Sequence, residues 1–320
     1  MERAERDDLE RGLRNAVGTR RGPALEAALT ELGWRDALGV DPPTAVSVLF
    51  ELQGTYLSSS SALDDVLRWG IGLEMAPDVG IVLPELGQSH PPADLKDETL
   101  TINGLGSASL QSRGITLVIA RTGGTEVATQ VPTRDLTIRP VPGIDPDLGL
   151  MEVTGTLSGR GLRTEDVTEP WSSAVAVGQL AIGYELVGAA RRMLEVARLH
   201  AIERVQFGQP ISMFQAVRHR LAETLVAIES ADAVLQTAWE DISPMVGLVA
   251  KALAGRAART ASRHCQQVLA GIGFTTEHEF HRYARRVFVL DQLLGSTRTL
   301  TRQFGTDLLT TGQLPDFAPL

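Results

Sequence analysis

Several features that define other classes of protein are scarce or missing in this sequence. The 320 residues include one cysteine, Cys265, so a disulfide cannot form within the chain. The net charge is −9, and the Lys and Arg residues are scattered rather than clustered with aromatic side chains, which argues against a general nucleic-acid-binding protein. No run of about 18 apolar residues predicts a membrane span.

The N-terminus also lacks the pattern of a secretory signal. Residues 1–8 are mostly charged and contain no apolar core. Together with the single cysteine, this predicts a soluble protein of the reducing cytoplasm. Hydrophobic residues make up 43% of the chain and charged residues 22%, which is typical of a globular protein. Because domains commonly contain about 100–200 residues, the length allows two or three packed modules.

The hydrophobic pattern divides the chain into three regions, and it predicts an α+β fold class. Over residues 1–72 apolar residues recur every three or four positions, which predicts three or four short helices separated by Gly and Pro. Ser58–Ser61 lies within this period and is predicted to be a helix face of small residues, with a flexible linker as the alternative. Residues 73–159 predict a small β domain, and residues 160–320 return to helices.

The β region consists of short, mostly β-branched runs separated by Gly, Pro or Asp. The runs begin at Ile81, Leu100, Ile115, Val127 and Leu136. Gly123–Gly124 is followed by neither a helix nor a lysine, so it is predicted to be a turn between strands rather than a phosphate-binding loop. Asn103–Gly104 is also a strong turn signal and predicts a hairpin.

A long amphipathic helix organises the C-terminal region. Its apolar face continues to Arg204, after which Gly208 and Pro210 end the helix. Ser212 and Gln215 predict a capping box for the helix that follows. The corner between the two helices therefore presents a charged tip.

Beyond the helix that directly follows this corner, three more helices are predicted. One begins at Ser243–Pro244, where Ser is the N-cap and Pro occupies the first helical position. Two shorter helices cover about residues 277–294 and 296–309. Long antiparallel helices of this kind form a bundle.

Two motifs at helix ends resemble the acyl-CoA dehydrogenase family. The first is Arg204-x-x-Phe207-Gly208, and the second runs from Gln267 to Phe274 through Gly271. The resemblance covers about residues 171–304 and implies an acyl-CoA dehydrogenase-like fold, with an N-terminal helical domain (1–72), a middle β domain (73–159) and a C-terminal helical bundle (160–320). In the family the arginine approaches the FAD pyrophosphate. The resemblance therefore implies FAD as the cofactor, with these residues binding it: Arg204, Gln206, Phe207, Gln267 and Gly271.

The flavin-ring platform of the family is not recognisable. The segment around Asn103–Gly104 resembles the family signature Y-x-L-N-G-x-K-x-W-I-T, whose Trp and Thr contact the isoalloxazine. Here Leu100, Gly106, Ala108 and Leu110 replace its Tyr, Lys, Trp and Thr. The resemblance therefore implies that this chain has lost the platform.

The family's catalytic base is also missing. Acyl-CoA dehydrogenation needs a carboxylate that removes the α proton of the thioester while hydride leaves to the flavin. In the commonest arrangement this glutamate lies in a Y-E-G-T motif, where the present sequence has Leu294. In the other known arrangement the matching position is about Gly178, with Gln179 beside it. The nearest carboxylate, Glu185, is expected to be solvated or ion-paired, so no catalytic residue is predicted in this chain.

Two histidine groups favour structural roles. His278 and His281 have a spacing that could hold a metal, but we interpret them as the polar start of a helix, and no metal is predicted. His264 and Cys265 lie within an apolar-periodic helix, where an unpaired cysteine behaves as a small hydrophobe.

The retained motifs all belong to the half of the flavin site that one acyl-CoA dehydrogenase subunit donates to its neighbour. The lost residues all belong to the receiving half. This division resembles actinobacterial heteromeric (α2β2) acyl-CoA dehydrogenases, many of which act on CoA thioesters of steroid side chains. The resemblance implies a base-lacking subunit that shares FAD and an acyl-CoA substrate with a second acyl-CoA dehydrogenase chain. The alternatives are a flavin-free interaction protein that retains the fold and a homomeric enzyme with an unrecognised base.

Overall fold

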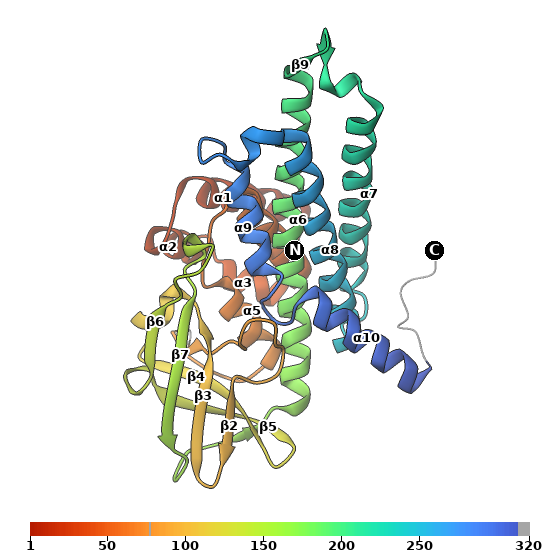
Figure 1. Cartoon of the computed structure of the whole chain (residues 1–320). Helices are drawn as coiled ribbons and strands as arrows, with labels where there is room; N and C mark the ends of the chain where they lie inside the picture. The colour runs from red at the N-terminus through yellow and green to blue at the C-terminus, as the bar shows by residue number, and fades with distance from the viewer. Residues whose placement is uncertain (77, 313–320) are drawn as a thin grey trace.

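The computed structural model describes residues 1–76 and 78–312, and helix α6 runs through its length (Figure 1). This helix, Thr168–Glu203, packs against α4, α5, α7, α8 and α9. One window of α6 is apolar and long enough to cross a membrane, but 94% of that window is buried inside the protein. Its apolar composition is therefore that of a core helix.

Five helices precede the sheet: α1 (Arg3–Thr19), α2 (Pro23–Glu31), α3 (Trp34–Val40), α4 (Pro42–Tyr56) and α5 (Ala62–Ile71). Helix α4 begins where Asp41 accepts a hydrogen bond from the Thr44 amide (3.3 Å), with Pro42 at the first position. The helix ends at Leu57, which has φ +50°, and residues 58–60 are irregular. The prediction of a helix face at Ser58–Ser61 was therefore wrong. The Ser58 carbonyl instead accepts a hydrogen bond from Arg286 (3.0 Å).

The middle of the chain forms one sheet in which β6-β7-β3-β2-β4-β5-β8 are neighbours in that order and β1 pairs with β4. The strands are β1 (Gly80–Ile81), β2 (Ala93–Lys96), β3 (Thr99–Gly106), β4 (Ile115–Thr122), β5 (Thr125–Pro132), β6 (Thr137–Pro140), β7 (Met151–Ser158) and β8 (Glu165–Asp166). The turn at Gly123–Gly124 is confirmed, since both residues have positive φ between β4 and β5.

The hairpin predicted at Asn103–Gly104 was wrong, because both residues lie inside β3. That strand pairs with β7 along its whole length, from Thr99–Ser158 to Gly106–Met151. A Cβ on Gly104 would lie 2.4 Å from the Leu83 carbonyl oxygen, so glycine here permits close packing rather than a turn.

The C-terminal helices are α7 (Gln215–Thr237), α8 (Pro244–Leu269), α9 (Phe280–Leu290) and α10 (Thr297–Thr311), and they form a bundle with α6 (Figure 1). The predicted N-cap Ser243 is confirmed, since its side chain accepts a hydrogen bond from the Val246 amide (3.3 Å). The predicted capping box of α7 was wrong. Ser212 lies in a separate 3-10 turn (Ile211–Met213), and Phe214 is the N-cap.

Candidate functional site

The arginine motif occupies the far end of the bundle, away from the sheet (Figure 1). Arg204 caps α6, and its carbonyl accepts a hydrogen bond from the Ile211 amide (2.8 Å). A small hairpin of β9 (Val205–Gln206) and β10 (Gln209–Pro210) follows, with Phe207 and Gly208 at its turn. Both turn residues have positive φ, 52° and 81°. The Arg204 side chain is exposed, with no ion pair to any residue that the structure describes.

Exposed apolar side chains surround this tip. Phe207 is 92% exposed and contacts Phe214 edge to face, with ring centroids 6.1 Å apart. Gln206 is exposed and donates only to the neighbouring Val205 carbonyl. Leu199, Ile202, Val205 and Met213 are each more than 40% exposed on the same end. A cluster of this kind on one end of a bundle is typical of an interaction surface.

The second motif lies at the same end of the bundle. Gln267 is on the last turn of α8, and Gly271 is in the 3-10 turn after it (Ala270–Phe274). Both are exposed and line one groove of about 950 Å³. Burial lowers the pKa of His200 on α6, and the charges of His278 and Arg204 lower it further. Folding thus places both motifs, which are about 60 residues apart, toward the same end of the bundle.

The two positions at which the sequence resemblance predicts the family's base are in contact. Leu294 is 1% exposed, and its Cδ1 atom lies 2.6 Å from the point that a Cβ on Gly178 would occupy. The amide of Gln179 donates a hydrogen bond to the Leu294 carbonyl (3.0 Å). Apolar packing therefore fills both positions.

A buried lysine anchors the turn that carries Leu294. Lys251 of α8 donates hydrogen bonds to the carbonyls of Asp291 (3.0 Å) and Gly295. Burial lowers the pKa of Lys251 to about 7, although the nearby Asp291 raises it. Asp291 in turn accepts hydrogen bonds from Thr297. These contacts hold the turn rigidly against the bundle.

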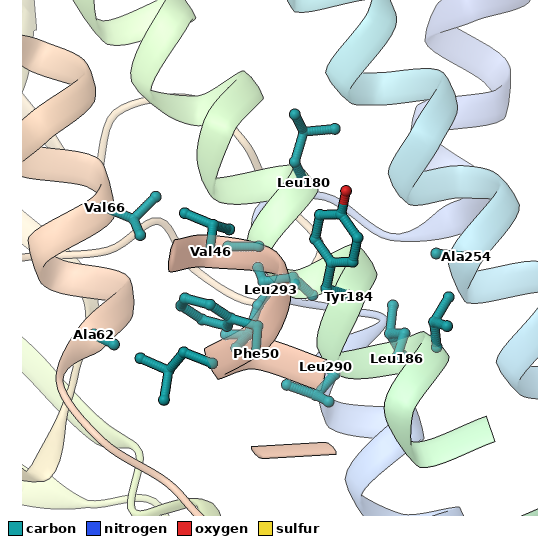
Figure 2. Packing of buried hydrophobic residues seen from close by; sticks show 14 of the residues in the cluster. Val46, Phe50, Ala62, Val66, Leu180, Tyr184, Leu186, Ala254, Leu290 and Leu293 are labelled. Carbon is teal, nitrogen blue, oxygen red and sulfur yellow. The ribbon is translucent and has the colours of Figure 1, made fainter. Parts of the chain in front are cut away.

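Next to this turn lies a small cavity of about 50 Å³. Figure 2 shows Phe50 and Leu293, which line it, packed together between α4 and α6. A water molecule occupies about 30 Å³ in the liquid, so the cavity can hold one or two waters but no acyl chain.

Glu185 lines this cavity. Its side chain is ion-paired, which is one of the two environments, solvated or ion-paired, that the sequence predicted. Its Oε1 atom accepts a hydrogen bond from the Arg286 guanidinium (3.3 Å). Burial raises the pKa of Glu185 to about 7, although Arg286 lowers it. Arg286 is fully buried and also binds Asp145 and the Ser58 carbonyl. One guanidinium thus joins the helical N-terminus, the β region and the bundle.

Residues 141–150 form a strap over the cavity. Asp145 binds Arg286, and Asp147 binds Arg282 (3.3 Å). The hydroxyl of Ser59 donates to the Asp147 carbonyl (3.1 Å), and Leu148 and Leu150 line the cavity below. The strap closes this side of the interior.

The sequence analysis did not single out Arg286, whose neighbour Arg285 is exposed. The buried side chains of α9 include Phe280, Tyr283, Val287 and Leu290, and Arg286 lies on the same helical face. The apolar period of this helix was the signal that could have found it.

A second buried acid was also missed. Asp64 of α5 lines the cavity and accepts a hydrogen bond from the Ser107 hydroxyl (2.7 Å). Burial raises the pKa of Asp64 to about 7, and the Ser107 hydrogen bond lowers it less strongly. Its other oxygen has no hydrogen-bond partner among the residues described.

The positions of the flavin-ring platform have other roles here. Leu110 is fully buried in the core of the sheet, where its side chain packs against Gly80 and Gly106. Ala108 is exposed, and its side chain has no aromatic ring that could contact a flavin.

The histidine and cysteine that the sequence analysis considered have structural roles. His278 caps α9 by accepting a hydrogen bond from the Phe280 amide (3.1 Å). Burial raises the pKa of Cys265 to about 12.

Comparison with known proteins identifies the family. Residues 171–309 match the acyl-CoA dehydrogenase C-terminal domain. The chain is 29% identical over 323 residues to the acyl-CoA dehydrogenase IpdE2 of Mycobacterium tuberculosis, and the match covers 95% of this chain and 97% of that protein. Residues 171–309 are therefore assigned to the acyl-CoA dehydrogenase family. The family and fold predicted from the two motifs are therefore confirmed.

Solved structures of acyl-CoA dehydrogenases extend the likeness to the whole fold. A variant of the steroid ACAD Tcur3481-Tcur3483 superimposes with a TM-score of 0.77 at 21% identity, covering 97% of this chain and 98% of that chain. The ChsE4-ChsE5 complex of Mycobacterium tuberculosis gives a TM-score of 0.74 at 19% identity, covering 97% and 99%. The acyl-CoA dehydrogenase fold thus spans the N-terminal helices and the sheet as well as the bundle.

Proposed function

We propose that this chain is the base-lacking subunit of a heteromeric, FAD-dependent acyl-CoA dehydrogenase of the cytoplasm. The exposed tip and groove residues would extend toward a FAD whose ring and catalytic glutamate lie in a second acyl-CoA dehydrogenase subunit. The residues proposed to reach that FAD are Arg204, Gln206, Phe207, Gln267 and Gly271.

One contrast within the chain carries this proposal. The residues of the donated half are exposed at one end of the bundle, where a second chain can reach them. On the side of the receiving half, Leu294 is buried, and the cavity lined by Leu293 and Glu185 has a volume of about 50 Å³. A chain that bound and oxidised its own acyl-CoA would need an open interior pocket on this side.

The donor chemistry fits the polar half of FAD but not its ring. A guanidinium such as that of Arg204 offers a fork of donors to pyrophosphate oxygens. The buried Nε2 atom of Gln266, beside Gln267, is a donor with no partner among the described residues. Bound FAD would supply the acceptor for the hydride that leaves the β carbon. The α proton would pass to the glutamate of the other subunit, since Glu185 is buried and paired with Arg286.

The substrate class is proposed from the relatives. The steroid ACAD and the two-chain ChsE4-ChsE5 complex support a heteromer that acts on a CoA thioester of a steroid side chain, as in cholesterol breakdown. By the same likeness we propose a heterotetramer that contains two copies of each chain.

Co-expression with candidate acyl-CoA dehydrogenase partners tests the proposal. We expect the chain alone to bind little FAD and the complex to hold about one FAD per heterodimer, measured by flavin absorption and native mass. A fully flavinated homomer would overturn the division of labour. A stable complex without flavin would instead support the flavin-free interaction protein.

A further inference from the structure

The small cavity between α4, α5 and α6 has a polar side as well as an apolar one. Phe50 and Leu293 belong to its apolar side. Its polar lining residues are Gln53, Ser59, Ser60, Asp64, Ser107 and Glu185. Two of these are acids, and no lysine or arginine lines the cavity within the part of the chain that the structure describes. A space that one or two water-sized particles can fill is therefore bounded by side-chain oxygens and negative charge.

Asp64 provides a buried carboxylate oxygen that the protein leaves unused. The residue is 5% exposed, and its Oδ2 atom accepts the hydrogen bond from the Ser107 hydroxyl (2.7 Å). Its Oδ1 atom has no hydrogen-bond partner among the described residues. The arginines nearby pair with the neighbouring acid instead, since Arg35 (3.0 Å) and Arg68 (2.9 Å) both contact Asp65. Because a buried carboxylate oxygen without a partner costs free energy, Oδ1 is an open ligand position.

The second acid adds to the negative charge around the cavity. Glu185 is paired with Arg286 (3.3 Å), but the same guanidinium also binds Asp145. One cation is thus shared by two carboxylates, and it does not compensate the charge of Asp64.

The serine hydroxyls in the lining can act as acceptors, because each already donates its proton to another protein oxygen. Ser59 donates to the Asp147 carbonyl (3.1 Å), Ser60 to the Gln53 side chain (3.1 Å) and Ser107 to Asp64. A hydroxyl oxygen has two lone pairs, and at least one remains on each of the three. Carboxylate, hydroxyl and amide oxygens are the ligands of hard cations. No group of three or more His, Cys, Asp or Glu side chains in the described residues could hold a metal ion, so this oxygen set suits a monovalent ion better than a transition metal.

We propose that this cavity binds a monovalent alkali cation of the size of Na⁺, with Asp64 Oδ1 and the hydroxyl oxygens of Ser59, Ser60 and Ser107 as ligands. The ion neutralises Asp64 and joins α5 to the segment before it and to the residue after β3. Ser59 and Ser60 are half-buried, so the ion can enter from their side. The site involves none of the residues proposed to reach FAD, and all its ligands come from this chain.

The test measures the melting temperature of the full-length chain while NaCl replaces choline chloride at constant ionic strength. Choline is too large for a cavity of about 50 Å³. Burial raises the pKa of Asp64 to about 7, so the measurement is made at pH 8, where the carboxylate is ionised. We expect the melting temperature to rise with the Na⁺ concentration, because a ligand that binds only the folded state stabilises it.

Variants locate the ion. Asp64→Asn should weaken Na⁺ binding roughly 10-fold or more, since it removes the charged ligand. The matched control is Asp65→Asn, which changes the adjacent buried acid, does not alter the cavity lining and should keep the response to Na⁺. In choline chloride Asp64→Asn should be more stable than wild type at pH 8, and Na⁺ should narrow this difference. Crystals of the wild-type chain grown with thallium(I), which replaces alkali ions, should show an anomalous peak inside the cavity.

Three results would overturn the assignment. Equal melting temperatures in Na⁺ and choline would mean that the cavity holds water or that Asp64 keeps its proton. An undiminished Na⁺ response in Asp64→Asn would place the ion elsewhere, and so would a thallium peak outside the cavity. Because the chain is tested without flavin or partner, each of these results leaves the proposed function unaffected.

Discussion

The side chain of Leu294 packs directly onto the bare backbone of Gly178, with Cδ1 2.6 Å from where a Cβ would be. The resemblance to the family predicts the catalytic base at these two positions. The space between them is filled because glycine on α6 leaves room for leucine from the turn after α9. A side chain at Gly178 would displace Leu294, and the predictions below begin from this contact.

Leu294→Glu should not create an active site in this chain. A glutamate here would be buried in apolar packing, which costs several kcal/mol or forces the acid to stay protonated. We expect a lower melting temperature and no turnover in a complex whose partner has lost its own glutamate. Leu294→Met is the matched control and should be nearly neutral. Turnover restored by Leu294→Glu would show that this side retains a usable pocket.

Arg204→Ala should lower the FAD occupancy of the complex without unfolding it. The side chain is exposed, so the change in folding free energy should stay within about 0.5 kcal/mol. Loss of a charge-assisted hydrogen bond to pyrophosphate should raise the Kd for FAD roughly 10- to 100-fold. Fluorescence titration of the apo complex measures this. Arg198→Ala, on the exposed side of the same helix, is the control. Equal FAD affinity in both variants would remove Arg204 from the cofactor site.

Glu185→Gln should leave turnover of the complex largely intact. Glutamine retains the size of glutamate and can still accept the hydrogen bond from Arg286. Loss of a true general base would cost about 10²–10⁴-fold in turnover, so the two cases separate clearly. Removal of the partner's glutamate provides the comparison and should abolish activity. If Glu185→Gln lost most of its turnover while flavin stayed bound, Glu185 would be the catalytic base, as the homomeric alternative requires.

Arg286→Met should loosen the strap at residues 141–150. Methionine fills much of the same space but leaves Asp145 and Glu185 without their shared cation, and a broken buried pair costs about 3–5 kcal/mol. Hydrogen exchange should increase in the strap and at Ser58, while the Arg204 tip should exchange as before. Arg285→Met alters the exposed neighbour and is the matched control. If hydrogen exchange rose equally in the strap and at the Arg204 tip, the substitution would have destabilised the whole protein instead.

Asp64→Asn should make the chain more stable at pH 8 and less sensitive to pH. Burial raises the pKa of Asp64 from 3.8 to about 7 in the folded chain, so the folded state holds a proton that the unfolded state releases. Stability due to this group is therefore full below pH 3.8 and declines as the pH rises toward 7. The asparagine variant avoids this cost, which is on the order of 2–4 kcal/mol.

Denaturant unfolding of wild type and Asp64→Asn at pH 5 and pH 8 measures the effect. Asn can still accept the hydrogen bond from Ser107, which makes the substitution conservative. The gain should be larger at pH 8 than at pH 5. A gain that does not depend on pH would mean that Asp64 titrates normally.

The sequence by itself determined the features that depend on near neighbours in the chain. The apolar period identified the long helix that ends at Arg204, Ser243–Pro244 marked the start of α8, and Gly123–Gly124 marked a turn. These signals are local because capping, periodicity and positive φ involve residues within a few positions of each other. The two motifs that identified the family are short and local for the same reason.

Only the tertiary structure decided what is buried and what is closed. Gln179 and Leu294 are 115 residues apart, and Arg286 and Ser58 are 228 apart, yet each pair shares a hydrogen bond. Asn103–Gly104 became part of a strand because pairing with β7 and close contact with Leu83 outweighed its turn propensity. A sequence shows that a glutamate is missing at Leu294. Long-range packing decides that Gly178 lies beneath Leu294 and that little space remains between them. Local propensity does not encode this packing.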